Sequence, residues 1–128
     1  MKRKIGSVFA KLVLALTLVG CGQSGGGVSA FDDISQLKEA FEKAGGSCLQ
    51  WNQSNKVTSA LQSGDCNSET VLMLFGSSEE AKERAEEIRA MYIGFGTEPN
   101  LLLGENWLIN SKQVNSVHPA MGGTLIRD

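Results

Sequence analysis

The chain has 128 residues with 12 basic and 14 acidic side chains, which gives a formal net charge of −2. This length allows one domain of common size. An acidic chain gains nothing from counterion release on nucleic acid, which needs clustered Lys and Arg, so we expect no nucleic-acid partner.

The first segment, residues 1–20, has the pattern of a cleavable leader. Its basic residues are Lys2, Arg3, Lys4 and Lys11. Lys11 leaves only residues 12–19 as an unbroken apolar run, which is shorter than the roughly 20 residues of a spanning helix but fits the roughly 7–15 of a signal peptide. An ordinary secretory signal is the remaining alternative. It would end in an A-x-A-like site, which residues 18–21 match less well.

The leader ends in the tetrad Leu18-Val19-Gly20-Cys21. This tetrad resembles the lipobox of bacterial lipoprotein signals, whose pattern is Leu-small-Gly/Ala-Cys. The resemblance implies that Cys21 receives a diacylglycerol, with fatty acids such as palmitate, and becomes the first residue of the mature protein. Two acyl chains hold a protein stably on a membrane, whereas one is marginal. We therefore expect an extracytoplasmic protein that is anchored to the cell membrane by lipid on Cys21.

Cleavage after residue 20 would make the protein more acidic. It removes four of the 12 basic residues and none of the 14 acidic ones, so eight remain against fourteen and the net charge becomes −6. Anionic headgroups repel such a domain, so the lipid has to supply the anchorage. Residues 21–30 then form a lipidated Gly/Ser tether, whose flexible part reaches roughly 15–18 Å. Residues 31–128 remain as one small domain.

Cys48 and Cys66 are the cysteines that remain once Cys21 carries lipid. In an oxidising compartment their simplest fate is a disulfide, which closes a loop of 19 residues counting both ends; two unpaired thiols are the alternative. Their spacing is not that of a C-x-x-C redox motif. A zinc site that adds His118 would match no recognised spacing. We expect no metal and no cofactor.

Local patterns in the first half of the domain predict one helix and several strands. Apolar residues at three- and four-residue spacing predict a helix over 33–44, with Asp32 or Asp33 as its N-cap and two glycines after it. Residues 48–51 and 57–61 are strand candidates, and residues 63–67 have the composition of a loop. Residues 70–75 are apolar on both faces and form the best strand candidate.

The second half predicts a longer helix and a hairpin. Ser77 and Glu80 have the spacing of a capping box before this helix. A hairpin follows over 101–109, then a short helix that His118-Pro119 interrupts, and a last strand over 124–126. This order predicts an α+β fold with helices packed mainly on one face of an antiparallel sheet, of which a ferredoxin-like arrangement is one form.

The sequence contains no recognisable catalytic constellation. His118 is the single histidine, so Ser-His-Asp or Cys-His chemistry would depend on it alone, and its place beside Pro119 suits a loop. The glycine-containing turn at 94–99 follows a helix and lacks lysine, so it does not form a phosphate cradle. We therefore expect that the protein is not an enzyme.

Trp51 and Trp107 are candidate binding residues, and both lie on predicted strands. A tryptophan on a strand usually fills the edge of a core with its N–H near water. The alternative is an aromatic anchor on a binding face, where Asn106 and Asn110 would supply hydrogen bonds beside Trp107. Loss of partner capture without unfolding in Trp107→Ala would favour the anchor, and unfolding would favour the core.

Several segments together resemble small lipoproteins of actinobacteria and their phages. These segments are the tetrad 18–21, the Gly/Ser tether, residues 45–48 followed by Trp51, and residues 104–110. Similar anchored proteins encoded on prophages can block DNA entry by a second phage, so the resemblance implies superinfection exclusion as an alternative function. The residues themselves favour a membrane-anchored binding or interaction module with a protein partner in the cell envelope, because they suggest a surface rather than a catalytic site.

Overall fold

The computed structural model describes residues 29–127, so the expectations for Cys21 and the leader lie outside the described residues. Within this range, three helices and a five-stranded antiparallel sheet confirm the α+β class. The helices are α1 (Ile34–Lys43), α2 (Ser78–Gly94) and α3 (Val114–Met121). The strands are β1 (Gln62–Asn67), β2 (Thr70–Leu74), β3 (Leu101–Leu103), β4 (Trp107–Asn110) and β5 (Thr124–Ile126), and they lie side by side in the order β1-β2-β4-β3-β5.

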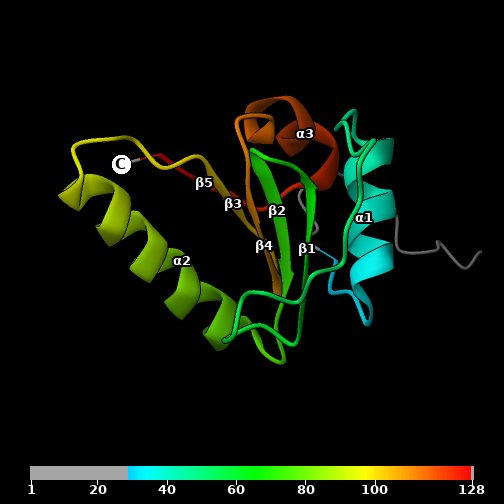
Figure 1. Ribbon diagram of the computed structural model, residues 1–128, viewed down its shortest axis with the longest axis horizontal. Helices are drawn as coiled ribbons and strands as arrows, with labels where there is room; N and C mark the ends of the chain where they lie inside the picture. The colour runs from blue at the N-terminus through cyan, green and yellow to red at the C-terminus, as the bar shows by residue number, and fades with distance from the viewer. Residues whose placement is uncertain (1–28, 128) are drawn as a thin grey trace, which may run out of the picture.

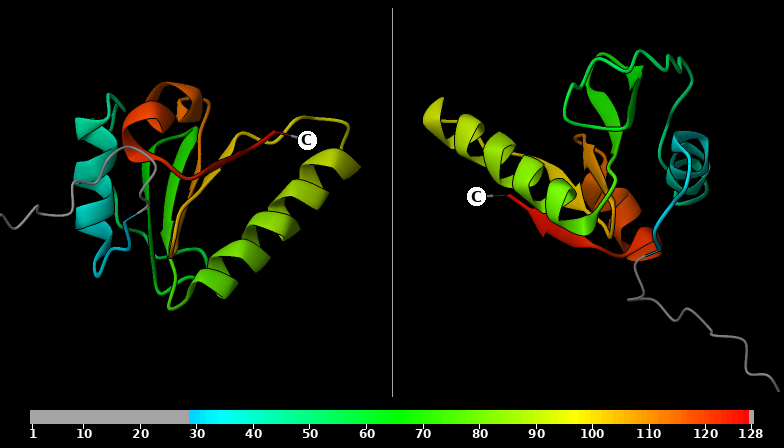
Figure 2. Two further views of the ribbon diagram at one scale, coloured as in Figure 1. Left: turned by 180° about the vertical axis from the view of Figure 1, so that it is seen from behind. Right: turned by 90° about the horizontal axis from the view of Figure 1, so that it is seen from below.

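The helices divide between the two faces of the sheet. Helices α1 and α3 pack together on one face, and α2 lies against β3 and β4 on the other (Figures 1 and 2). Two of the three described helices therefore share a face. The order αββαββαβ also differs from the βαββαβ order of a ferredoxin-like fold, so that arrangement is not the one observed.

Strand β2 shows why the sheet needs cover on both sides. Leu72 and Leu74 point into the core beneath α1 and α3, whereas Met73 and Phe75 point into the core beneath α2. All four side chains are buried. Because successive side chains of a strand point to opposite faces, this apolar run contributes to two separate cores, one on each side of the sheet.

Helix α1 begins and ends close to its predicted limits. The Asp33 side chain accepts a hydrogen bond from the backbone N–H of Ser35 at 2.7 Å and so caps the helix. Hydrogen bonds from the Ser35 hydroxyl and N–H hold the pKa of the Asp33 carboxyl below its ordinary value. At the other end, Gly45 follows with φ of 103°, a conformation that glycine adopts without strain.

Helix α2 begins with half of the predicted capping box. The backbone N–H of Glu80 donates to the Ser77 hydroxyl at 3.2 Å, as expected. The Glu80 carboxylate, however, accepts from the N–H of Gly76 at 3.0 Å rather than from Ser77. The cap therefore fixes the turn that leads from β2 into α2.

The weakest predictions concern the segment between α1 and β2. Residues 48–51 and 57–61 do not form named strands, and residues 63–67, expected as a loop, lie within β1. Strand β1 is polar and contains Gly64, so its own composition favours a turn. It forms because it pairs with β2 on one side, while Asn52 bridges to Asp65 on the other.

Helix α3 continues past the predicted interruption. His118 and Pro119 lie inside the helix rather than in a loop. Pro119 removes one backbone donor, and the helix ends two residues later at Met121. Val114 and Val117 of this helix face the core and are fully buried.

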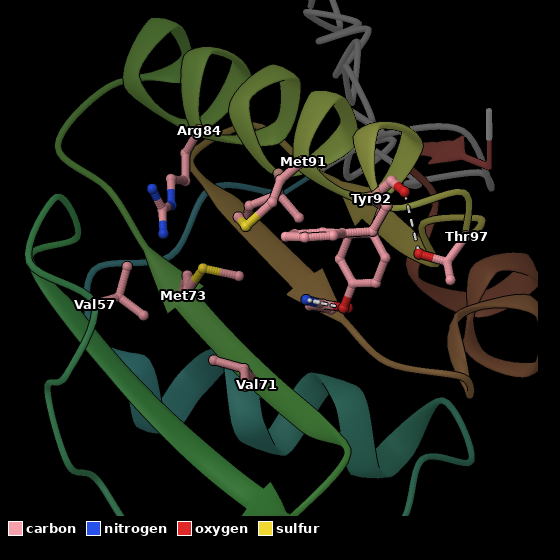
Figure 3. Close-up of a pocket in the computed structure, with 10 residues that line it drawn as sticks. Val57, Val71, Met73, Arg84, Met91, Tyr92 and Thr97 are labelled. Carbon is pink, nitrogen blue, oxygen red and sulfur yellow. Dashed lines mark hydrogen bonds between the residues drawn. The ribbon is translucent and has the colours of Figure 1, made fainter.

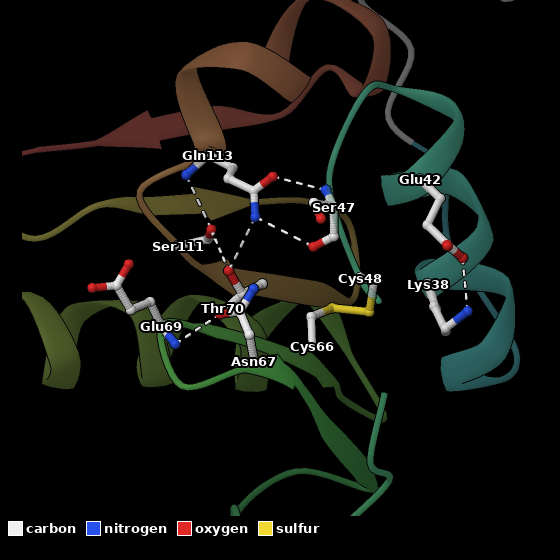
Figure 4. Close-up of a disulfide and its surroundings, with 10 residues drawn as sticks. All are labelled: Lys38, Glu42, Ser47, Cys48, Cys66, Asn67, Glu69, Thr70, Ser111 and Gln113. Carbon is white, nitrogen blue, oxygen red and sulfur yellow. Dashed lines mark hydrogen bonds and ion pairs between the residues drawn. A yellow bond between two sulfur atoms is a disulfide. The ribbon is translucent and has the colours of Figure 1, made fainter. Parts of the chain in front are cut away.

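The predicted disulfide between Cys48 and Cys66 is present and joins the segment after α1 to β1 (Figure 4). Both cysteines are buried in the core beneath α1. Next to them, the Gln113 side chain accepts from the N–H of Ser47 at 2.8 Å and donates to its carbonyl at 3.3 Å. The disulfide and this amide together hold the loop after α1 against the start of α3.

Candidate functional site

Trp107 does not form a binding surface. Its side chain is 1% exposed and lies in the core beneath α1. The indole N–H donates to the carbonyl of Ser29 at 2.8 Å, and the ring lies 6.1 Å from that of Phe31, centroid to centroid. The hypothesis of an aromatic anchor at Trp107 is therefore wrong, because the ring fills the space under the incoming chain.

Asn106 and Trp51 also make contacts that hold the fold together. The Asn106 side chain accepts from the N–H of Phe31 at 3.0 Å and donates to its carbonyl at 2.8 Å, which ties the first described residues to the turn between β3 and β4. Trp51 is half-buried and lies directly over Gly64 of β1, where a Cβ would overlap its ring. Neither side chain points into the groove described next.

Asn110, one of the four predicted binding residues, borders a groove in the described part of the chain. A groove of about 390 Å³ lies between α2 and the α2-facing side of β2 (Figure 3). Its lining residues are Val57, Val71, Met73, Arg84, Ile88, Met91, Tyr92, Phe95, Thr97 and Asn110. This volume falls in the range of about 300–1,000 Å³ that is usual for small-ligand sites.

The groove exists because α2 covers only part of its sheet face. Helix α2 packs on β3 and β4. Strand β2 is the neighbour of β4 in the sheet. Val71 and Met73 of β2 form the floor, while Ile88 and Met91 of α2 form a wall. At the rim, Met91 is 49% exposed and Phe95 is 79% exposed, so apolar surface faces solvent where a ligand would enter.

Few polar groups face this apolar lining. Asn110 Nδ2 donates to the Tyr92 hydroxyl at 3.3 Å, and the Thr97 hydroxyl donates to the Tyr92 carbonyl at 3.1 Å. Arg84 is the charged residue of the lining. Its side chain extends from α2 toward Val57 and Met73 (Figure 3). Its Nη1 donates to Glu87 at 3.0 Å, whereas its Nε is buried without a hydrogen-bond partner among the described residues.

A second hollow of about 470 Å³ continues from the groove and shares four lining residues with it: Val71, Tyr92, Thr97 and Asn110. This hollow is more strongly charged. Glu69 and Glu98 line it together with Lys112, whose ammonium lies 3.2 Å from the Glu69 carboxylate. The groove and its extension therefore have a cationic end at Arg84 and a mainly anionic end at the two glutamates.

The single histidine of the sequence is not among the lining residues of the groove. His118 lies on α3, on the opposite face of the sheet, where its Nε2 is 3.2 Å from the carbonyl of Gly123. Among residues 29–127, no group of three or more His, Cys, Asp or Glu is placed to hold a metal ion. In the same range, no helix is long and apolar enough to cross a membrane.

No family model, curated protein or solved structure matches the chain. The groove therefore has to be interpreted from its own residues. The sequence identifies Asn110 as a candidate binding residue among those that line the groove. The sequence does not single out Arg84, because the charged residues of α2 have the pattern of a solvated helix face. Only the packing of α2 shows that the Arg84 guanidinium turns inward.

Proposed function

We propose that this chain is a lipid-anchored binding protein on the outer side of the cytoplasmic membrane, and that the groove between α2 and β2 is its binding site. The proposal that the protein binds a ligand is supported by the open groove, with Met91 and Phe95 exposed at its rim. Apolar side chains gathered around a concave surface with few polar groups are typical of a ligand site.

The proposal of a lipid-anchored protein outside the cytoplasm depends on the tetrad 18–21 and on the disulfide. Disulfides persist in oxidising compartments and are rare in the cytosol, so a buried Cys48–Cys66 bond supports an extracytoplasmic domain. The first described residues are held at the turn between β3 and β4 by Asn106. A lipidated tether would therefore join the domain beside α1 and α3, and the groove faces the other side of the sheet.

The envelope component that this protein binds would be held at the groove. The protein partner expected from the sequence stays a prediction. Trp107 does not support a protein-contact surface, because its indole is buried. The exposed side chains of Met91 and Phe95 form the proposed apolar contact surface instead of Trp107.

We expect Cys21→Ala to move the protein out of the membrane fraction and to abolish its labelling with radioactive palmitate. The physical reason is that two acyl chains supply the membrane affinity, which an acidic domain cannot supply itself. Cell fractionation and immunoblotting measure the first effect and fluorography the second. The matched control is Ser24→Ala in the tether, which should leave both unchanged; a Cys21→Ala protein that stays membrane-bound and labelled would contradict the proposal.

A further inference from the structure

We propose that the groove binds a small amphiphilic carboxylate, such as a free fatty acid, with its carboxylate at Arg84 and its hydrocarbon chain along β2. This inference rests on the proposed function and adds the chemical class of the ligand. Its starting point is Arg84, whose buried Nε has no hydrogen-bond partner among the described residues although it lines an open groove. A buried donor without a partner is costly, and a bound acceptor would remove that cost.

A carboxylate fits this position better than a neutral acceptor. The guanidinium is always charged and presents its N–H groups in a fork that matches the two oxygens of a carboxylate. Only Nη1 is engaged by Glu87, in an exposed pair on the helix surface, and pairs of this kind are weak. The Arg84 guanidinium therefore has hydrogen-bonding capacity beyond its pair with Glu87.

The charges of the adjoining hollow fix the direction of the ligand. At the far end two glutamates, Glu69 and Glu98, outnumber the one cation, Lys112, so the net negative charge there disfavours a carboxylate and favours its placement at Arg84. Between the two ends lie Met73, Ile88 and Met91. Methionine side chains are flexible and adapt to apolar ligands of varied shape, which suits an alkyl chain.

The floor of the groove argues against an extended peptide as the occupant. Strand β2 pairs with β1 on one side and with β4 on the other, so its backbone groups are already engaged in the sheet. A peptide that adds to a sheet needs a free strand edge for its own N–H and C=O groups. An alkyl chain carries no such groups, and burying it leaves no polar atom unsatisfied.

The test uses the purified full chain, reconstituted in phosphatidylcholine vesicles, with a photoreactive decanoic acid and the methyl ester of the same compound. We expect the acid to label peptides that contain Met73 or Met91. Arg84→Gln should lower acid labelling about tenfold, the loss of roughly one charge-assisted hydrogen bond, and leave ester labelling unchanged. Comparing the two probes across the variants cancels their different partition into the lipid.

The matched control is Arg89→Gln, which removes a guanidinium from the same helix. Arg89 is half-buried like Arg84 and lies 3.9 Å from Glu86, and it is not among the lining residues. Its replacement should change neither labelling. A competition on the unaltered protein needs no variant: excess decanoate should displace the acid probe about tenfold better than decanol does.

The proposal fails if acid and ester labelling depend equally on Arg84, if both Arg variants lose label equally, or if the labelled peptides lie outside the groove. Displacement by a short apolar peptide better than by decanoate would also overturn it. These outcomes remove the ligand class while leaving an anchored binding protein. Membrane association and palmitate labelling that are both independent of Cys21 would instead remove the proposed function, whatever the photolabelling result.

Discussion

Replacing Trp107 with alanine is expected to lower the free energy of unfolding by about 3–5 kcal/mol. The indole is 1% exposed, packs beneath Phe31 and covers Gly104, where a Cβ would overlap its ring. Alanine would leave a cavity and would remove the hydrogen bond to the Ser29 carbonyl. A domain of this size has about 5–15 kcal/mol in total, so the loss is a large fraction of its stability. Urea titration followed by far-ultraviolet circular dichroism measures the loss.

The matched control for Trp107 is Trp51, the other tryptophan. Trp51 is half-buried and lies at the edge of the same core, so Trp51→Ala should cost clearly less than Trp107→Ala. Trp107→Phe keeps an aromatic ring and should fall between the native protein and Trp107→Ala. An unfolding midpoint for Trp107→Ala equal to that of the native protein would contradict the buried position.

Removing the disulfide is expected to cost roughly 3 kcal/mol, the chain-entropy value for a loop of this size. The bond joins residues separated by 18 positions and is buried together with both of its cysteines. The double variant Cys48→Ala/Cys66→Ala removes the covalent link that closes the loop between α1 and β1. Its urea midpoint should lie well below that of the oxidised protein.

Reduction provides an independent measure of the same bond. Dithiothreitol should lower the midpoint of the native protein toward that of the double variant and should leave the double variant unchanged. Ser63→Ala, a change at a buried polar position of β1, should retain the response to reductant. A native midpoint that does not respond to reductant would show that the bond does not constrain the unfolded chain.

Elements whose local pattern agrees with their packing could be predicted from the sequence. Strand β2 is apolar on both faces and is central, and α1 carries its cap at Asp33. Strand β1 is not predicted by its own sequence, because Gln62, Gly64 and Asp65 favour a turn. Its pairing with β2 and its cover by residues 50–55 override that preference, and neither is visible in its own residues.

The candidate site was harder to predict than the fold. Trp107 and Asn106 are candidate binding residues by sequence, yet both hold residues 29–31 against the turn between β3 and β4. Asn110 borders the groove because its side chain points to the face of α2. The groove depends on how far α2 extends across the sheet, and helical periodicity identifies the buried face of a helix but not its position over the strands.

The central claim is that the groove of an anchored protein holds a component of the envelope. A photoreactive amino acid at position 91, on intact cells that express the full chain, tests it most directly. Position 82 is the control, because nine residues along an α-helix place it on the opposite side of α2; Lys82 is exposed and does not line the groove.

Irradiation should add a defined mass to the protein from position 91 and not from position 82, and Cys21→Ala should reduce this adduct by releasing the protein from the membrane. The mass of the intact protein reports either a small ligand or a larger partner. Equal adducts from both positions, or no adduct from position 91, would contradict the account.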